Sequence, residues 1–247
     1  MQIYANIYKI GYTLLRTIYP VLGISDSGTK SSTNFQNTLA LNTLPWLRQE
    51  IVKISENQAV IASGNSNLLS VTEFGASQEE KLVTIQESAL GVFVLQNSQL
   101  SVTVQDGCIT SLYDRKAKRE VLSGKANKFV IFDDQPIYWQ AWDVEVYHLE
   151  TRQELHSSTT TILENTPYQV SVVTETKVSE MSSIRSTITL ASAFDGQQSY
   201  VECSAEIDWH ETMKFLKVEF PVDVRNTEAS YETQFGIIKR PTHYNTS

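Results

Sequence analysis

The stretch YVECSAEIDWHETMKFLKVEFPVDV, residues 200–224, decides the fold of this chain. Apolar and polar residues alternate from Val201 to His210, which is the period of a strand with one buried face. A short polar break follows, and a second apolar run begins at Phe215 and carries Pro221 near its end. We therefore predict two strands and a turn, paired as a hairpin that buries its apolar face against a large neighbour.

Length and composition describe a globular chain. Its 247 residues, 41% hydrophobic and 19% charged, are enough for the core of one large or two modest domains. No apolar run approaches the ~20 residues that span a bilayer, and no signal-peptide pattern follows Met1. The net charge of −8 and the pI of about 5.1, with scattered Lys and Arg, argue against nucleic acid as a partner. Cys108 and Cys203 lie in strand-like segments, where we expect buried thiols rather than a disulfide.

The N-terminal segment differs from the rest because it has helical periodicity. Its apolar residues recur three or four positions apart and form one stripe of a helix, beside a row of tyrosines: Ile3, Ile7, Ile10, Leu14 and Ile18, then Tyr4, Tyr8 and Tyr12. Pro20 and Gly23 end this helix. A helix with two apolar faces needs several neighbours, so we interpret residues 1–24 as the last helix of a helical bundle. Residues 25–34 are polar and predict a linker.

From residue 35 onward the pattern indicates strands. The runs lie at 36–42, 49–54, 58–62, 68–73, 82–86, 92–96, 100–105, 109–113, 129–132, 144–149, 159–163, 170–178 and 184–190. Asp106-Gly107 accepts the positive φ angles of a tight hairpin turn. We therefore predict a mainly β fold, a large antiparallel β-sandwich over 35–247. A division into a small β subdomain, 35–90, and a main sandwich, 91–247, is the alternative.

Side chains with catalytic chemistry gather most densely on the opening strand. Glu206, Asp208 and His210 share one face of that strand, and Glu211 follows at once. The pattern fits a carboxylate pair for glycosyl transfer or a metal site. It fits equally a solvated face of a half-buried strand.

Other polar and aromatic residues leave similar alternatives open. His148 and His156 do not have the spacing of metal ligands. The acidic pair 133–134 indicates a turn, or a cation site if further oxygens converge on it. Trp139 and Trp142 fit either a sugar-stacking surface or partly buried core. Phosphate-loop, nucleophile-elbow and Cys-x-x-Cys motifs are absent from the sequence.

Five strings resemble the non-catalytic C-terminal half of glycoside hydrolase family 38 α-mannosidases, in their cytosolic and fungal vacuolar branch. They are NTLPWLRQEIV (42–52), GCITSLYDRKAKREVL (107–122), AWDVEVY (141–147), EIDWHETMKFLKVEFPVDV (206–224) and YETQFGIIKRPTHYNTS (231–247). The resemblance is collinear over nearly the whole chain. Residues 1–15 also resemble the helix that follows the catalytic region in that branch.

The resemblance implies a parent enzyme that is a retaining α-mannosidase, with zinc held by His and Asp ligands and an Asp nucleophile. In the family those residues belong to an N-terminal α/β domain and the start of the bundle, so the resemblance places no catalytic residue and no zinc ligand in this chain. It implies a supersandwich like that of galactose-mutarotase-like domains and residence in cytoplasm or vacuole. The implied partners are the N-terminal catalytic domain, a mannose-containing oligosaccharide bound through the parent enzyme, and a homo-oligomer.

The resemblance also selects a candidate sugar-contacting segment near the C-terminus. Loops of the family's β-region help to wall the mannose-binding cleft, and this string offers groups that hydrogen-bond hydroxyls: Tyr231, Gln234, Arg240, His243 and Asn245. Alternatively, residues 240–242 are a strand exit that packs against a further domain. Asn245 also begins a glycosylation sequon, which we expect to be unused without a signal peptide.

Three hypotheses of function follow. The leading one is the scaffold and cleft wall of an α-mannosidase, inactive alone and prone to self-association through uncovered apolar faces. The second is a stand-alone carbohydrate-binding or interaction β-sandwich. The third is an independent hydrolase that uses Glu206 and Asp208, which predicts that Asp208→Asn abolishes activity.

Overall fold

The computed structural model describes residues 2–18, 39–42, 46, 48–55, 58–64, 70–73, 82–140, 142, 144–194 and 197–243. The chain divides into two compact units, Met1–Thr38 and Leu39–Ser247. The predicted linker at 25–34, Pro20 and Gly23 lie outside the described residues. Within the described part of the chain, no helix is long and apolar enough to cross a membrane.

The first unit contains one helix, α1, which spans Gln2–Ile18. It confirms the helix predicted from the spacing of its apolar residues. The hydroxyls of Thr13 and Thr17 donate to carbonyls one turn back, those of Lys9 and Leu14. Because one helix cannot bury two apolar rows by itself, this stripe is suited to packing against further helices.

The second unit is built almost entirely of strands. In chain order these are β1 (Leu39–Asn42), β2 (Arg48–Ser55), β3 (Gln58–Gly64), β4 (Ser70–Glu73), β5 (Thr84–Ala89), β6 (Val92–Gln96), β7 (Leu100–Gln105), β8 (Cys108–Asp114), β9 (Arg119–Glu120), β10 (Lys128–Asp133), β11 (Gln153–Glu154), β12 (Ser157–Asn165), β13 (Gln169–Lys177), β14 (Ser183–Ala191), β15 (Val201–Asp208), β16 (Lys214–Glu219), β17 (Glu228–Thr233) and β18 (Gly236–Pro241). A short 3-10 helix, η3 (Val146–Thr151), lies between β10 and β11.

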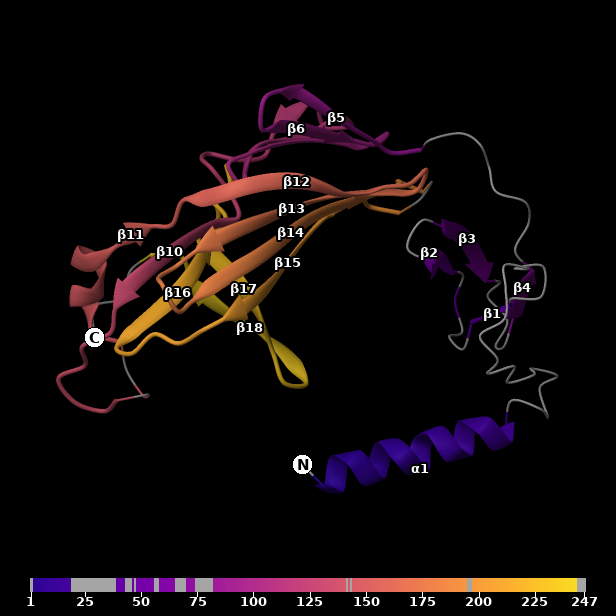
Figure 1. Ribbon diagram of the computed structural model, residues 1–247, viewed down its shortest axis with the longest axis horizontal. Helices are drawn as coiled ribbons and strands as arrows, with labels where there is room; N and C mark the ends of the chain where they lie inside the picture. Colours follow the sequence, from indigo (N-terminus) through magenta and orange to yellow (C-terminus); the bar gives the residue numbers. More distant parts are fainter. Residues whose placement is uncertain are drawn as a thin grey trace. The chain divides into compact units, whose positions relative to one another are not determined.

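Two antiparallel sheets form the sandwich. One has five strands in the order β5-β6-β7-β8-β9, and the other has four in the order β12-β13-β14-β15. Figure 1 shows β5 and β6 lying over the sheet of β12 to β15. A three-stranded sheet, β11-β10-β16, and the pairs β1-β4, β2-β3 and β17-β18 complete the described strands. The predicted fold class, a mainly β antiparallel sandwich preceded by one helix, is confirmed.

The hydrophobic core lies between the two sheets of the sandwich. Alternate residues of each strand face it, as the pleat of a strand requires. Burial of each such side chain stabilises the fold by about 1.5–3 kcal/mol. The fully or nearly fully buried members include Phe93, Leu95, Val102, Val104 and Ile109 from one sheet, and Val170, Val172, Ile188 and Leu190 from the other.

The meander formed by β6, β7 and β8 agrees with its prediction to within one residue at each end. Its turn uses Asp106 and Gly107 with φ angles of 51° and 72°. Glycine is required at 107 for a second reason, because a Cβ there would overlap the side chains of Ser157 and Thr174. The turn and the packing of the two sheets therefore depend on the same residue.

Residues 200–224 form two strands but no hairpin, so the predicted pairing is wrong. β15 pairs with β14, whereas β16 pairs with β10 in another sheet. Val201 and Cys203 pack against the core, while Ile207 at the far end of this edge strand is exposed. Alternation specifies a strand and its buried face but not its partner. Residues 209–213, with Met213 at a φ of 56°, carry the chain between sheets.

The strand predicted at residues 144–149 is also wrong, because this segment contributes to η3 instead. The backbone N–H of His148 donates to the carbonyl of Glu145, and Thr151 Oγ1 donates to the carbonyl of His148 at 2.8 Å. His148 Nδ1 lies 2.7 Å from the same Glu145 oxygen. Local hydrogen bonds of this kind compete with pairing to a neighbouring strand.

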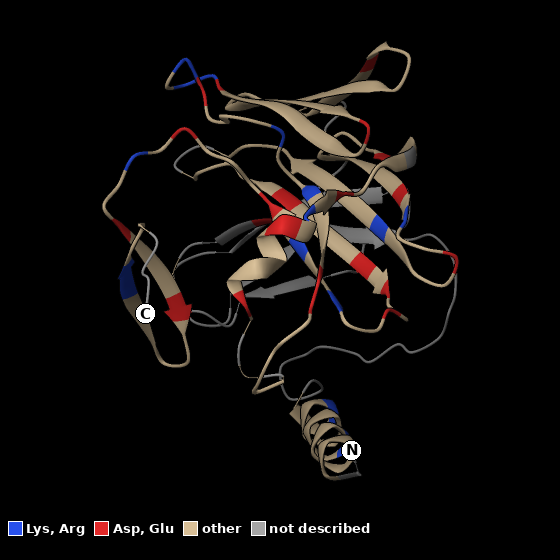
Figure 2. Ribbon diagram, turned by 90° about the vertical axis from the view of Figure 1, so that its left-hand side faces the viewer, with Lys and Arg blue, Asp and Glu red and all other residues tan. Residues whose placement is uncertain are grey.

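Charged residues are dispersed over the second unit, as Figure 2 shows for both signs. One cluster joins three strands. Lys128 Nζ lies 2.9 Å from Glu154, and Arg152 Nη2 lies 2.8 Å from Glu219. Lys128 also reaches Glu219 at 3.3 Å. These contacts connect β11 and β16 across β10.

Candidate functional site

The sugar-contacting residues predicted near the C-terminus belong to the hairpin of β17 and β18. Tyr231 pairs with Ile238, and Ala229 pairs with Arg240. Because every second residue of a strand faces the same side, Tyr231 and Arg240 lie on one face of the hairpin. The structure therefore brings an aromatic ring and a guanidinium to one side of this element.

The other predicted residues lie at the two ends of the same hairpin. Gln234 is in the turn between β17 and β18, whereas His243 follows the end of β18. A strand of six residues is about 17–20 Å long, so these two side chains cannot contact the same sugar ring. Asn245 lies outside the described residues.

The hairpin is exposed on both faces. Every residue of β18 is exposed, and so is every residue of β17 except Ala229. At the base of the hairpin, Thr242 Oγ1 donates a hydrogen bond to the carbonyl of Asn226 at 2.7 Å. A two-stranded hairpin is marginally stable by itself, so this element is suited to packing against a further surface.

A hollow of about 830 Å³ lies at the base of the hairpin. Its described lining comprises Val222, Val224, Arg225, Asn226, Thr227, Glu228, Ala229 and Thr242. None of the predicted sugar-contacting residues belongs to this lining. The hollow and the face that carries Tyr231 and Arg240 are therefore separate features.

The carboxylates of the opening strand lie on an open surface. Asp208 Oδ1 contacts His210 Nε2 at 2.9 Å, and the Asp208 side chain is 71% exposed. Glu206 stands opposite Arg185 of β14. The pKa of Glu211 is lowered by hydrogen bonds from Ser179 and Ser182, which favours the carboxylate. This arrangement fits a solvated strand face and lacks the burial that prepares a general acid.

His148 has structural contacts, whereas His156 is exposed. The ring of His148 lies 5.1 Å from the rings of Phe132 and Phe215, and its Nε2 lies 3.2 Å from Lys217 Nζ. Among the described residues, no group of three or more His, Cys, Asp or Glu is arranged to hold a metal ion. The Asp208–His210 pair has no third ligand, so the described side chains do not fit the zinc that the resemblance implies.

The acidic pair at 133–134 does not form a cation site with the other described residues. Asp133 ends β10 and its carboxylate lies 2.6 Å from Lys214 Nζ, so a lysine ammonium occupies the position that a bound cation would take.

Trp139 and Trp142 are both exposed, so the prediction that they are partly buried in the core is wrong. The backbone N–H of Trp142 donates to the backbone carbonyl of Trp139 at 2.8 Å, in a turn where Trp139 has a φ of 61°.

Both cysteines are free and half-buried, so they are less buried than the sequence predicts. Burial raises the pKa of the Cys203 thiol to about 11 and raises that of Cys108 in the same direction. Neither thiol is prepared as a nucleophile, because nucleophilic attack requires the thiolate.

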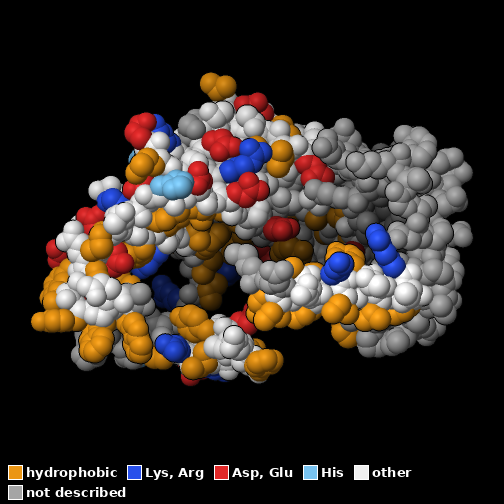
Figure 3. All heavy atoms as spheres, turned by 60° about the horizontal axis from the view of Figure 1, so that its bottom comes forward, with side chains coloured by type: hydrophobic (Ala, Val, Ile, Leu, Met, Phe, Trp, Pro, Cys, Tyr) orange, Lys and Arg blue, Asp and Glu red, His pale blue; other side chains and the backbone are white. Residues whose placement is uncertain are grey.

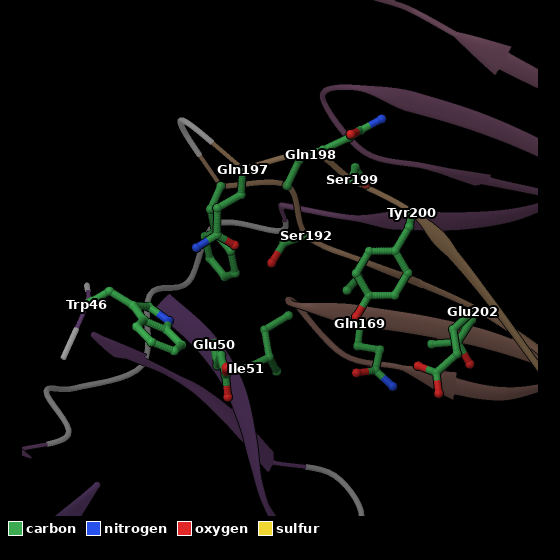
Figure 4. A pocket seen from close by; sticks show the side chains of 14 residues that line it. Trp46, Glu50, Ile51, Gln169, Ser192, Gln197, Gln198, Ser199, Tyr200 and Glu202 are labelled. Atoms are coloured by element: carbon green, nitrogen blue, oxygen red, sulfur yellow. The ribbon is translucent and has the colours of Figure 1, made fainter. Parts of the chain in front are cut away.

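A pocket that the sequence did not indicate lies at one end of the four-stranded sheet. Its volume is about 560 Å³, and its described lining combines residues of the β14–β15 connection with Trp46, Glu50 and Ile51. Figure 4 shows Ser192, Gln197 and Tyr200 across from Trp46 and Glu50. These residues lie far apart in the chain and form no motif, so sequence reasoning had no signal for them.

The described part of the β-sandwich contains no recognisable catalytic centre, and comparison with known protein families explains why. Residues 95–247 match the family described as Glycosyl hydrolases family 38 C-terminal domain. The match covers more than half of the chain and includes β7, β8 and β9 of one main sheet and all four strands of the other. The chain therefore belongs to glycosyl hydrolase family 38, and the resemblance found in its sequence is confirmed.

Similarity to individual proteins extends beyond that domain. The chain is 34% identical over 263 residues to Alpha-mannosidase 2C1 of Mus musculus and 35% identical over 260 residues to that of Homo sapiens. It is 36% identical over 220 residues to Alpha-mannosidase of Saccharomyces cerevisiae. These matches cover 100%, 99% and 84% of the chain but 24%, 24% and 18% of the relatives. The chain spans about a quarter or less of the length of these proteins.

Proposed function

We propose that this chain is a non-catalytic part of a retaining, zinc-dependent α-mannosidase that hydrolyses α-linked mannose from oligosaccharides. In this proposal the sandwich supports the catalytic domain, and the β17–β18 hairpin walls part of the sugar cleft. Membership of family 38 and the similarity to α-mannosidases support a hydrolase parent. The observation that carries the proposal is the apolar surface exposed over β16, β17 and β18.

That surface is contributed by consecutive segments of the C-terminal region. Its exposed apolar side chains are Met213, Val218, Phe220, Val222, Val224, Tyr231, Phe235, Ile237 and Ile238. Figure 3 shows hydrophobic side chains gathered on the side toward which β17 and β18 project. Because Tyr231 and Ile238 lie on one face of the hairpin and Ile237 on the other, the hairpin exposes apolar side chains on both faces. The surface thus supports an interface with a further domain of the parent enzyme.

The hairpin side chains have the chemistry that a cleft wall needs. The Tyr231 ring can stack on the C–H face of a sugar, and the Arg240 guanidinium on the same face can donate to hydroxyls. Gln234, His243 and Asn245 are assigned to neighbouring sugar units. Zinc chemistry belongs to the catalytic domain in this proposal, and no step of it uses a residue described here. We expect the parent enzyme to be a homo-oligomer of the cytoplasm or vacuole.

Hydrolysis of an aryl α-mannoside tests the proposal. The chain alone, with and without zinc, is expected to be inactive, while a mixture with the separately produced catalytic domain of a relative is expected to be active. Activity of the chain alone would contradict the proposal, and Asp208→Asn and Glu206→Gln would then identify the carboxylates responsible.

The role of the hairpin face is tested in the same mixture. Arg240→Ala is expected to raise KM about tenfold, the loss expected for one charge-assisted hydrogen bond. Lys239→Ala is the matched control, because Lys239 lies on the opposite face of the same strand. Equal effects of the two substitutions on KM would contradict the assignment of Arg240 to the sugar cleft.

A further inference from the structure

The pocket beside the β14–β15 connection contains a buried hydroxyl for which the described part of the chain supplies no hydrogen-bond partner. Ser192 is 6% exposed, and its Oγ has no partner among the described residues. Figure 4 shows this hydroxyl directed toward the space between Trp46 and Tyr200. An unsatisfied buried hydroxyl is unfavourable, and native structures usually supply it with a partner. Ser192 therefore points to a polar occupant of the pocket.

The backbone around Ser192 is held in place from the other sheet. Asn97, in the turn between β6 and β7, donates from Nδ2 to the Ala191 carbonyl and to Ser199 Oγ, both at 2.7 Å. The amide of Gln99 donates to the Gln197 carbonyl and accepts from the Ser199 N–H, both at 2.9 Å. This side of the pocket is thus formed before any ligand arrives, which lowers the entropy lost on binding.

The lining has the chemistry of a site for a neutral, hydroxyl-rich ligand. Tyr200 and Trp46 offer exposed ring faces, on which the C–H groups of a sugar ring can stack. The amides of Gln169 and Gln198 can both donate and accept, and the Glu202 carboxylate can accept from hydroxyls. The described lining contains no Lys, Arg or His, which disfavours an anionic ligand.

We propose that this pocket, the Ser192 pocket, binds a sugar ring of a neutral saccharide. Ser192 Oγ exchanges a hydrogen bond with a sugar hydroxyl, Tyr200 stacks against the ring, and Glu202 accepts from a further hydroxyl. Its volume of about 560 Å³ lies within the range of about 300–1,000 Å³ common for small-molecule sites. The inference does not depend on the proposed function, because none of the described lining residues belongs to β17 or β18.

Saturation-transfer NMR and calorimetric titration of the 247-residue chain test the proposal. The probes are the methyl α-glycosides of mannose, glucose and galactose and a mannobiose, with inorganic phosphate and spermidine as charged comparisons. At least one neutral sugar is expected to bind, and neither charged probe is. Ser192→Ala is expected to weaken that binding about fivefold, the value of one net hydrogen bond, and Tyr200→Ala about tenfold.

Two controls separate loss of the site from loss of folding. Tyr138→Ala removes a tyrosine of matching exposure, 72% against 70% for Tyr200, and is expected to leave sugar binding unchanged. Ser192→Ala is expected to keep or raise the unfolding temperature, because it removes an unsatisfied hydroxyl. The proposal is overturned if no neutral sugar binds, if spermidine alone binds, or if both pocket variants bind sugar as tightly as the unmodified chain.

Discussion

At the scale of single residues, Asn97 has the most demanding position. It is 3% exposed, its Oδ1 accepts from the N–H groups of Gln99 and Leu100, and its Nδ2 donates to Ala191 and Ser199. Asn97→Ala leaves these partly buried groups without the partner that Asn97 supplies, so we expect the free energy of unfolding to fall by about 1–3 kcal/mol. Urea denaturation measures this change.

Gln99→Ala is the matched control for that substitution. Gln99 makes hydrogen bonds to the same connection but is only half-buried, so water can replace its amide. We expect a smaller loss of stability for this variant. A loss for Gln99→Ala as large as that for Asn97→Ala would contradict the special role given to the buried amide.

The ionic cluster on β10, β11 and β16 predicts a pH dependence. A hydrogen bond from Arg152 is the main cause that lowers the pKa of Glu219 below its ordinary 4.5. Because the folded pKa lies below the unfolded one, the stabilisation is present above about pH 4.5 and is lost as pH falls through the folded pKa. We expect Glu219→Gln to be about 0.5 kcal/mol less stable at neutral pH, since partly exposed pairs contribute little.

Thermal unfolding of both proteins from neutral to acidic pH measures this dependence. The unfolding temperature of the unmodified chain is expected to fall more steeply on acidification, so that the two curves converge. Glu180→Gln is the control for a fully exposed pair. The hydrogen bond from Lys177 also lowers the pKa of Glu180, but both side chains are far more exposed, so we expect a smaller change in the pH dependence. Parallel curves for Glu219→Gln and the unmodified chain would contradict the prediction.

At the scale of elements, the turn between β17 and β18 combines an unfavourable backbone with an exposed ring. Phe235 has a φ of 60° and its side chain is fully exposed. A left-handed conformation costs a non-glycine residue about 1–2 kcal/mol, whereas asparagine tolerates it better. We therefore expect Phe235→Asn to leave the chain as stable or more so, and to weaken its association with a catalytic domain if that ring is covered there.

Titration of a fixed amount of catalytic domain with each variant, followed by aryl mannoside hydrolysis, measures the association. Leu90→Asn is the control, because Leu90 is an equally exposed apolar residue in the turn between β5 and β6. Phe235→Asn should require about tenfold more chain for half-maximal activity, as expected for one buried aromatic anchor. Equal requirements for both variants would remove Phe235 from the interface.

Local signals explain which elements were predictable. The meander of β6 to β8 was predictable, because Asp106-Gly107 joins adjacent strands and the alternation of apolar and polar residues marks their buried faces. The partner strands of β15 and β16 were not predictable. Their pairing with β14 and β10 depends on contacts that the alternation of residues does not encode. Residues 144–149 carry a strand-like pattern but contribute to η3, since the side chains of His148 and Thr151 bond to nearby carbonyls.

The candidate sites differ in the same way. Tyr231 and Arg240 came from family resemblance, and only the register of β17 and β18 places them on one face. Ser192 could not be selected from the sequence, because nothing distinguishes it from other serines until Asn97 and Tyr168 fix its backbone. A pocket that depends on contacts between distant segments has no local pattern to reveal it.

At the scale of the whole molecule, two properties of the surface oppose each other. The chain carries a net charge of −8, which repels a second copy. It also exposes apolar residues on α1 and over β16 to β18. Repulsion between exposed charges is screened beyond about 10 Å at 0.1 M salt, while apolar attraction is not weakened by salt. The two properties therefore make opposite predictions for the effect of ionic strength.

We expect the apolar surfaces to dominate, so that the chain self-associates and does so more strongly as salt is added. Analytical ultracentrifugation at increasing protein and salt concentrations measures this. Replacing Ile237, which is 74% exposed on β18, by lysine should reduce self-association, whereas Lys239→Gln on the same strand should not. If added salt dissociates the assembly, ionic contacts hold it together, and the apolar surface over β16 to β18 loses the role proposed for it.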